Sequence, residues 1–101
     1  MAEKRKLSNE ELAEKLNGVP GWTVEAGRLT RTLNFRNFED AFAFMTRCAL
    51  EIEKMDHHPE WSNVYRRVKI ELSTHEVGGI SGLDFELASR INVVLDTFRQ
   101  A

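Results

Sequence analysis

Residues 37–55 read NFEDAFAFMTRCALEIEKM and contain the most regular helical pattern in the chain. Apolar residues recur there at steps of three and four, which is the spacing that places side chains on one face of an α-helix. Asn37 can cap the first turn, and Pro59 marks the end of the helix because proline cannot continue one. The stripe that we expect to face a core consists of Phe38, Ala41, Phe42, Met45, Cys48, Ala49, Ile52 and Met55.

Toward the N-terminus, the sequence predicts a short helix followed by a β-hairpin. Ser8 and Glu11 have the spacing of a capping box, in which each side chain satisfies the other residue's backbone N–H. The helix should stop within residues 17–21, which read NGVPG and hold several helix-ending signals. Residues 22–25 and 29–35 alternate apolar and polar side chains around a glycine-containing turn, which favours a hairpin with one solvated face.

Toward the C-terminus, a second β region precedes a last helix. Residues 61–74 contain alternating apolar and charged side chains. Tyr65-Arg66-Arg67 is either a tight turn that divides this region into two strands or part of one long strand. Ser81 and Asp84 form a second capping box. The apolar stripe of the last helix consists of Leu87, Ala88, Ile91, Val94, Leu95 and Phe98.

These elements predict an α+β fold in a single two-layer domain over residues 1–101. With the turn at residues 65–67, the order is helix-strand-strand-helix-strand-strand-helix. We expect a four-stranded antiparallel sheet with the helices on one face. Because a chain of 101 residues buries a modest core, a homo-oligomer, either a dimer or a tetramer, is also expected.

Composition excludes several classes of function. The formal net charge of -2 leaves no basic footprint for direct binding to nucleic acid or to an anionic membrane. No apolar run reaches the roughly 18 residues of a membrane-spanning helix. The single cysteine, Cys48, cannot form an internal disulfide, and the charged N-terminus does not resemble a signal peptide. We therefore expect a cytoplasmic protein.

All three histidines of the chain, His57, His58 and His75, lie in one short part of it. An imidazole, with an unperturbed pKa of about 6.5, exchanges protons near neutral pH. Structural alternatives exist, since His57 and His58 could complement the end of a helix dipole and His75 could be an ordinary turn residue. Carboxylates that could orient an imidazole are Glu53, Asp56, Glu60, Glu76 and Asp84.

Glu53 and Asp84 each have a second interpretation. Glu53 precedes His57 by four residues, one helical turn away on the same face, so it could hold a ring in one tautomer or raise its basicity. Asp84 alone is best explained as part of a capping box.

A metal site is the main chemical competitor, and we expect none. Adjacent histidines on a helix point about 100° apart and cannot easily bind one ion. The sequence also contains no HExxH or CxxC pattern.

Several segments together resemble the pterin-4a-carbinolamine dehydratase family. The resemblance extends over nearly the whole chain, and the spaced set of His-His-Pro, aromatic residue, second-strand histidine and distal aspartate is specific. The segments are residues 53–61 (EKMDHHPEW), 63–65 (NVY) and 73–76 (STHE), with Gly21-Trp22, Phe35, Phe38, Met45-Thr46-Arg47 and residues 83–88 as further matches.

The resemblance implies a dehydratase that removes water from 4a-hydroxytetrahydrobiopterin to give quinonoid dihydrobiopterin in tetrahydrobiopterin recycling, without a cofactor. His58 and His75 are then expected to transfer protons, and His57 to bind the leaving hydroxyl or a water. Pro59 and Trp61 are expected to wall the pocket. The full expected set of substrate-binding or orienting residues is Glu53, Asp56, Pro59, Trp61, Ser73, Thr74, Glu76, Val77 and Asp84.

A binding module is the alternative function, either a dimerisation cofactor or transcriptional coactivator, or a pterin-binding accessory protein. The family resemblance includes relatives that act as dimerisation cofactors for a transcription factor through helical contacts. The last helix, with Leu87, Ile91, Leu95 and Phe98, could serve such a helical protein partner or pack the protein's own tetramer.

Overall fold

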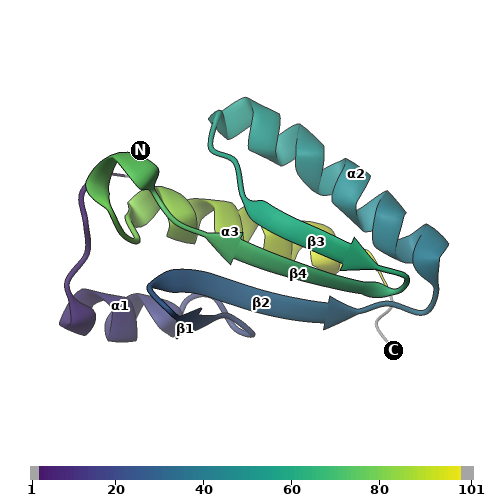
Figure 1. Ribbon diagram of the computed structural model, residues 1–101, viewed down its shortest axis with the longest axis horizontal. Coiled ribbons are helices and arrows are strands. Elements are labelled where there is room, and N and C mark those ends of the chain that lie inside the picture. Colours follow the sequence, from purple (N-terminus) through teal and green to yellow (C-terminus); the bar gives the residue numbers. More distant parts are fainter. Residues whose placement is uncertain (1–2, 99–101) are drawn as a thin grey trace.

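The structure, a computed structural model, describes residues 3–98. Residues 1–2 and 99–101 of the predicted domain lie outside this range. In chain order the elements are α1 (Asn9–Leu16), β1 (Thr23–Glu25), β2 (Arg28–Asn34), α2 (Phe38–Met55), β3 (Glu60–Val64), β4 (Arg67–Leu72), the short 3-10 helix η1 (His75–Val77) and α3 (Gly82–Leu95) (Figure 1). This order confirms the predicted succession of helices and strands.

The four strands form one antiparallel sheet in the order β1-β2-β4-β3. Each hairpin supplies one edge strand and one central strand, and the pairing of β2 with β4 joins the hairpins. Tyr65 adopts a left-handed conformation (φ 54°) between β3 and β4. The region after α2 is therefore two strands with a tight turn rather than one long strand.

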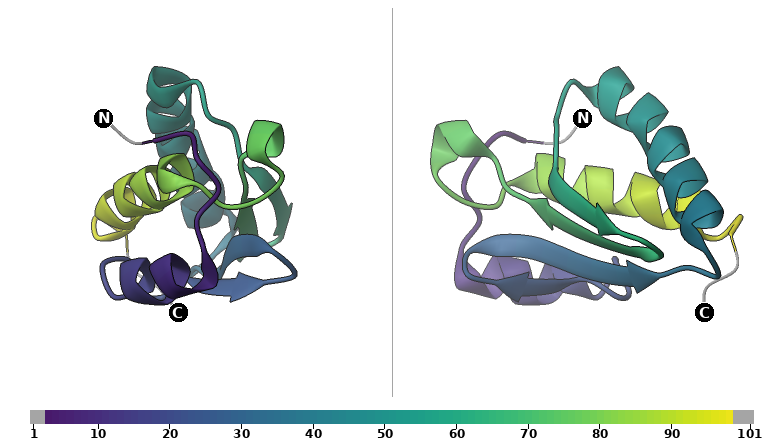
Figure 2. Two further views of the ribbon diagram at one scale, coloured as in Figure 1. Left: turned by 90° about the vertical axis from the view of Figure 1, so that its left-hand side faces the viewer. Right: turned by 45° about the vertical axis from the view of Figure 1, so that its right-hand side comes forward.

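One face of the sheet carries the core. Leu29 and Leu33 of β2 are paired with Leu72 and Val68 of β4, and all four side chains are buried. The three α-helices lie on this side of the sheet (Figure 2), which confirms the predicted two-layer α+β architecture. In residues 3–98 no helix is both long and apolar enough to cross a membrane.

The buried face of α2 differs from the predicted stripe. Ala41, Phe44, Cys48 and Ile52 are buried, whereas Phe38 and Phe42 are 47% and 55% exposed. At about 100° per residue, Phe42 lies a quarter turn from Ala41, outside the arc that reaches the core. The predicted stripe was too wide, and Phe44 was wrongly omitted from it. The rings of Phe38 and Phe42 instead contact each other, with centroids 5.7 Å apart.

The C-terminal end of α2 also differs from the prediction. The helix ends at Met55 because Asp56 turns into the left-handed region (φ 50°, ψ 42°). Pro59 therefore does not terminate the helix; the reversal occurs three residues earlier. As a consequence His57 and His58 lie in a connecting segment and not on the helix.

Both predicted capping boxes are present, with Ser8 and Glu11 on α1 and Ser81 and Asp84 on α3.

The apolar stripe of the last helix, α3, packs into the protein's own core. Leu87 and Ile91 are fully buried, and Leu95 is nearly so. These side chains are not available to a partner, so the predicted use of this stripe as an interface is wrong.

Candidate active site

A cavity of about 420 Å³ lies between the segment after α2 and the turn after β4. The three histidines meet here, His57 and His58 from the segment after α2 and His75 from the turn after β4. Its lining residues are Lys4, Met55, Asp56, His57, His58, Ser73, His75, Glu76 and Leu83.

Local backbone structure places the histidines at this cavity. The left-handed Asp56 turns the chain back from α2, so that His57 and His58 follow the reversal. On the other side, Thr74 pairs with Gly79 as an isolated β-bridge, with its N–H donating to the Gly79 carbonyl at 2.7 Å. This bridge closes the loop that begins with His75, and Gly78 completes it with a positive φ of 65°. The exposed His75 is thus held by a short, internally bonded turn.

His57 is the most firmly positioned of the three. Its Nε2 lies 2.6 Å from Oδ1 of Asp84, whose side chain is fully buried, while that of His57 is 11% exposed. An ionised carboxylate only accepts hydrogen bonds, so a neutral His57 must carry its proton on Nε2. Nδ1 is then the nitrogen with a free lone pair.

The other oxygen of Asp84 is bound from within the fold. Oδ2 accepts from the Thr74 hydroxyl and from the Ser81 backbone N–H, both at 2.9 Å. Since the only hydroxyl proton of Thr74 is used on Asp84, the Ser81 hydroxyl donates to Thr74 across 2.6 Å. The capping box of α3 therefore also orients a histidine. The two interpretations of Asp84 that the sequence left open both hold.

His58 has a looser partner. Its Nε2 lies 3.3 Å from Oε1 of Glu53, and both side chains are largely exposed, at 56% and 79%. The expected one-turn relationship of Glu53 to His57 does not form, because α2 ends before His57; the ring that Glu53 contacts is that of His58. The buried Asp84 orients His57 instead.

The remaining predicted residues fall into three groups. Asp56, Ser73 and Glu76 line the cavity. Glu53, Thr74 and Asp84 are not in the lining but bind lining residues or one another. The third group, which does not line the cavity, consists of Pro59, Trp61 and Val77. Trp61 instead packs, partly buried, against the core.

Within the part of the chain from residue 3 to residue 98, no three His, Cys, Asp or Glu side chains are grouped so that they could hold a metal ion.

Comparison with known proteins now identifies the family. The sequence profile described as "Pterin 4 alpha carbinolamine dehydratase" matches residues 5–94. The chain belongs to the pterin 4 alpha carbinolamine dehydratase family.

Similar members of the dehydratase family come from several bacteria. A protein of Prochlorococcus marinus (strain MIT 9215), named "Putative pterin-4-alpha-carbinolamine dehydratase", is 51% identical over 89% of this chain and 94% of its own length. A protein of Bradyrhizobium diazoefficiens with the same name is 50% identical over 93% of this chain and 94% of its own length. A crystal structure of a transcriptional coactivator/pterin dehydratase from Brucella melitensis superposes with a TM-score of 0.85. The two sequences are 41% identical, and the superposed region covers 89% of this chain and 98% of the Brucella melitensis chain.

Three residues that line the histidine cavity were missed by the sequence analysis. Met55 belongs to the apolar stripe of α2, and Leu83 follows the cap of α3, so both resembled structural residues. Lys4 belongs to no motif or apolar stripe, so no sequence pattern marked it as a site residue. Its ammonium group binds Glu76 at 3.0 Å, and the Leu7 N–H donates to the Ile80 carbonyl, so the N-terminal segment runs beside the η1 turn (Figure 1).

Proposed function

We propose that this protein dehydrates 4a-hydroxytetrahydrobiopterin to quinonoid dihydrobiopterin by histidine acid–base catalysis, as a step in tetrahydrobiopterin recycling. Membership of the dehydratase family supports the reaction class. The observation that carries the proposal is the convergence of His57, His58 and His75 on one cavity of about 420 Å³. That volume lies within the range of pockets that hold small organic molecules.

The reaction needs one proton donor and one proton acceptor. The C4a–O bond breaks and the hydroxyl leaves as water after it receives a proton. The N5–H bond also breaks, its proton goes to a base, and the nitrogen lone pair forms the C4a=N5 double bond. Imidazoles suit both tasks near neutral pH, and such acid–base catalysis typically contributes about 10²–10⁴-fold in rate.

We assign the proton transfers to His58 and His75 and the binding of the leaving hydroxyl, or of an orienting water, to His57. His58 and His75 are the exposed imidazoles of the pocket, so a ligand can reach their ring nitrogens. His57 is held by Asp84, which favours a fixed contact over a mobile one.

Recognition of the flat pterin ring is assigned to the segment that follows β4. The backbone N–H and carbonyl of Thr74 already bond within the turn, to Gly79 and Val77. Ser73, which lines the cavity, is therefore the better candidate to bind the amide-like edge of the pterin. Glu76 lies at the rim, where its ion pair with Lys4 borders the opening.

The experiment is a rate assay with freshly generated 4a-hydroxytetrahydrobiopterin. The proposal requires formation of quinonoid dihydrobiopterin well above the spontaneous rate, in proportion to protein concentration. A rate equal to that of the buffer, from a folded preparation, would reject it.

A second function, binding of a helical protein partner or of further copies of the chain, is supported by one observation. Phe38, Phe42 and Leu50 leave large apolar surface on the outer side of α2. The similar protein from Brucella melitensis is described as a transcriptional coactivator as well as a dehydratase. We therefore propose that α2, rather than α3, forms the contact of a dimer or tetramer or binds a helical partner.

A further inference from the structure

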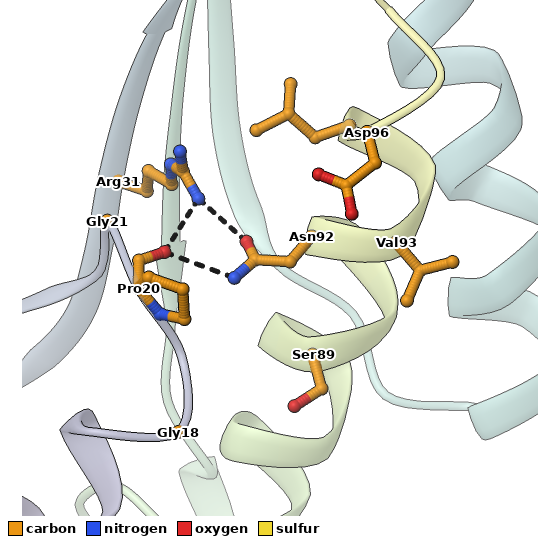
Figure 3. A pocket seen from close by; sticks show the side chains of 9 residues that line it. Gly18, Pro20, Gly21, Arg31, Ser89, Asn92, Val93 and Asp96 are labelled. Carbon is orange, nitrogen blue, oxygen red and sulfur yellow. Dashed lines mark hydrogen bonds between the residues drawn. The ribbon is translucent and has the colours of Figure 1, made fainter.

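A second cavity, of about 460 Å³, lies between residues 18–21 and α3 (Figure 3). It shares no lining residue with the histidine pocket. Its polar side chains are Arg31 from β2 and Ser89, Asn92 and Asp96 from α3 and its C-terminal cap. The dehydratase reaction proposed above uses none of these residues.

Arg31 occupies an unusual place in the sheet. In the register of β2 with β4 it is paired with Ile70, between the pairs formed by Leu29 and Leu33. It therefore lies on the core face, where its neighbours are buried and apolar. A charged group at such a position is costly unless it is bound by polar partners.

Those partners hold the guanidinium in one orientation. Its Nη1 donates to the Pro20 carbonyl at 2.9 Å and to Oδ1 of Asn92 at 2.8 Å. The same Oδ1 accepts from the Trp22 indole N–H at 2.8 Å, and the Asn92 amide donates back to Pro20 at 3.1 Å. Figure 3 shows Arg31 and Asn92 meeting at the Pro20 carbonyl.

The backbone of residue 21 is shaped around the guanidinium. Gly21 has a φ of +91°, and a Cβ added there would lie 2.4 Å from Cζ of Arg31. Of the guanidinium nitrogens of Arg31, only Nη1 forms the hydrogen bonds to the Pro20 carbonyl and to Asn92 of α3. Within residues 3–98, Nε and Nη2 of Arg31 donate no hydrogen bond to another residue. A planar pair of N–H groups of this kind matches the two oxygens of a carboxylate.

A negative charge stands on the other side of the same cavity. Asp96 lines it from the end of α3, yet forms no ion pair with Arg31. Burial lowers the pKa of Arg31, and the Asp96 carboxylate partly opposes that effect. The space between the two charges is flanked by the apolar side chains of Pro20, Val93 and Leu95.

We propose that this second cavity binds a free α-amino acid with an aliphatic side chain. The carboxylate accepts from Nε and Nη2 of Arg31, and the ammonium group donates to Asp96. The aliphatic side chain lies against Val93 and Leu95. A molecule with only one of the two charges leaves either Arg31 or Asp96 unpaired.

Trp22 provides a local reporter for this binding. The chain has two tryptophans, so the ¹H–¹⁵N spectrum holds two indole signals, and only Trp22 bonds to Asn92 at the cavity. L-leucine, titrated to about 20 mM so that a site with a Kd near 1 mM is saturated, should shift the Trp22 signal saturably. The Trp61 signal should stay in place. N-acetyl-leucine and leucinamide, each lacking one charge, should bind at least about tenfold more weakly, because each loses one charge-assisted contact.

Two variants separate binding from folding. Asp96→Asn keeps the backbone cap of α3 and should weaken the leucine response about tenfold without changing the melting temperature. Glu86→Gln removes the same charge from α3 outside the cavity and should bind as the wild type does. The proposal is overturned if leucine does not shift Trp22, if the three compounds act equally, or if Asp96→Asn responds like the wild type. None of these outcomes depends on dehydratase activity.

Discussion

Nε2 of His57 lies 2.6 Å from Oδ1 of Asp84, and the carboxylate is completely buried. The same carboxylate caps α3 and accepts from the hydroxyl of Thr74. One buried group therefore joins the start of a helix, the turn after β4 and a histidine of the pocket. Stability and site geometry are coupled at this point.

Asp84→Asn should change the tautomer of His57. The amide oxygen must face the Ser81 N–H and the Thr74 hydroxyl, so the amide NH₂ faces Nε2 of His57. The ring then carries its proton on Nδ1, the nitrogen otherwise free to accept. We expect kcat to fall by about 10²-fold, because His57 then presents a donor where it presented an acceptor to the leaving hydroxyl or its water, and misplacing such a contact costs a rate of that order. Long-range ¹H–¹⁵N spectra of the imidazole report the tautomer directly.

Glu53→Gln is the matched control, because it makes the same change beside His58. Glu53 and His58 are largely exposed and 3.3 Å apart. Such a surface pair contributes little, so kcat should change by less than about fivefold. Equal losses in the two variants would contradict a special role for the buried carboxylate.

The two capping boxes predict different stability losses. Ser8→Ala removes one exposed cap and should lower the free energy of unfolding by about 1 kcal/mol. Ser81→Ala also deprives the buried Thr74 hydroxyl of its donor, so the loss should be about 1–3 kcal/mol larger. Urea denaturation of both variants measures the difference. Equal losses would show that the buried hydroxyl network contributes nothing beyond capping.

Cys48 predicts a loss of stability in alkaline solution. Burial raises the pKa of this thiol from 9.0 to about 12, so the folded state holds the proton more tightly than the unfolded state. Ionisation of Cys48 therefore leaves the free energy of unfolding unchanged below about pH 9. Above that pH the unfolded state loses the thiol proton first, so the free energy of unfolding falls as the pH rises toward 12.

Urea denaturation between pH 8 and pH 11 in the wild type and in Cys48→Ala isolates this contribution. The difference between the two curves should decrease by up to about 1.4 kcal/mol per pH unit above the unfolded pKa. A difference that is independent of pH would contradict it.

The outer side of α2 predicts an effect on assembly. Phe42→Ser should shift the protein toward smaller species, because the ring of Phe42 is 55% exposed and forms an apolar surface with Phe38. Val64→Ser, at a position that is 58% exposed on β3, is the control. Light scattering after size-exclusion chromatography gives the mass. An unchanged mass in Phe42→Ser would exclude this side of α2 as the contact.

Local patterns were sufficient to predict most of the fold. Ser8, Asn37 and Ser81 each cap a helix as expected, since capping depends on residues within one turn. The limits came from geometry that no pattern encodes. Periodicity alone did not separate the buried Phe44 from the exposed Phe42. The left-handed conformation of Asp56, which is not a glycine, was not foreseeable and moved His57 off the helix.

For the candidate site, the sequence predicted the residue types better than their partners. The three histidines were recognised because imidazoles are rare and grouped in this chain. Their pairing depends on tertiary structure: His57 finds Asp84, 27 positions away, and Lys4 reaches Glu76 across 72. Contacts between such distant residues follow from the packing of α3 and the η1 turn, which sequence spacing does not specify.

The most direct test of the proposed chemistry is the rate of 4a-hydroxytetrahydrobiopterin dehydration by His75→Ala and His58→Ala beside the wild type. Both side chains are exposed, so the variants should fold with an unchanged melting temperature. We expect each to dehydrate the substrate about 10²–10⁴-fold more slowly than the wild type. A folded variant that turns over at the wild-type rate would contradict the role assigned to that histidine, and two such variants would contradict the account as a whole.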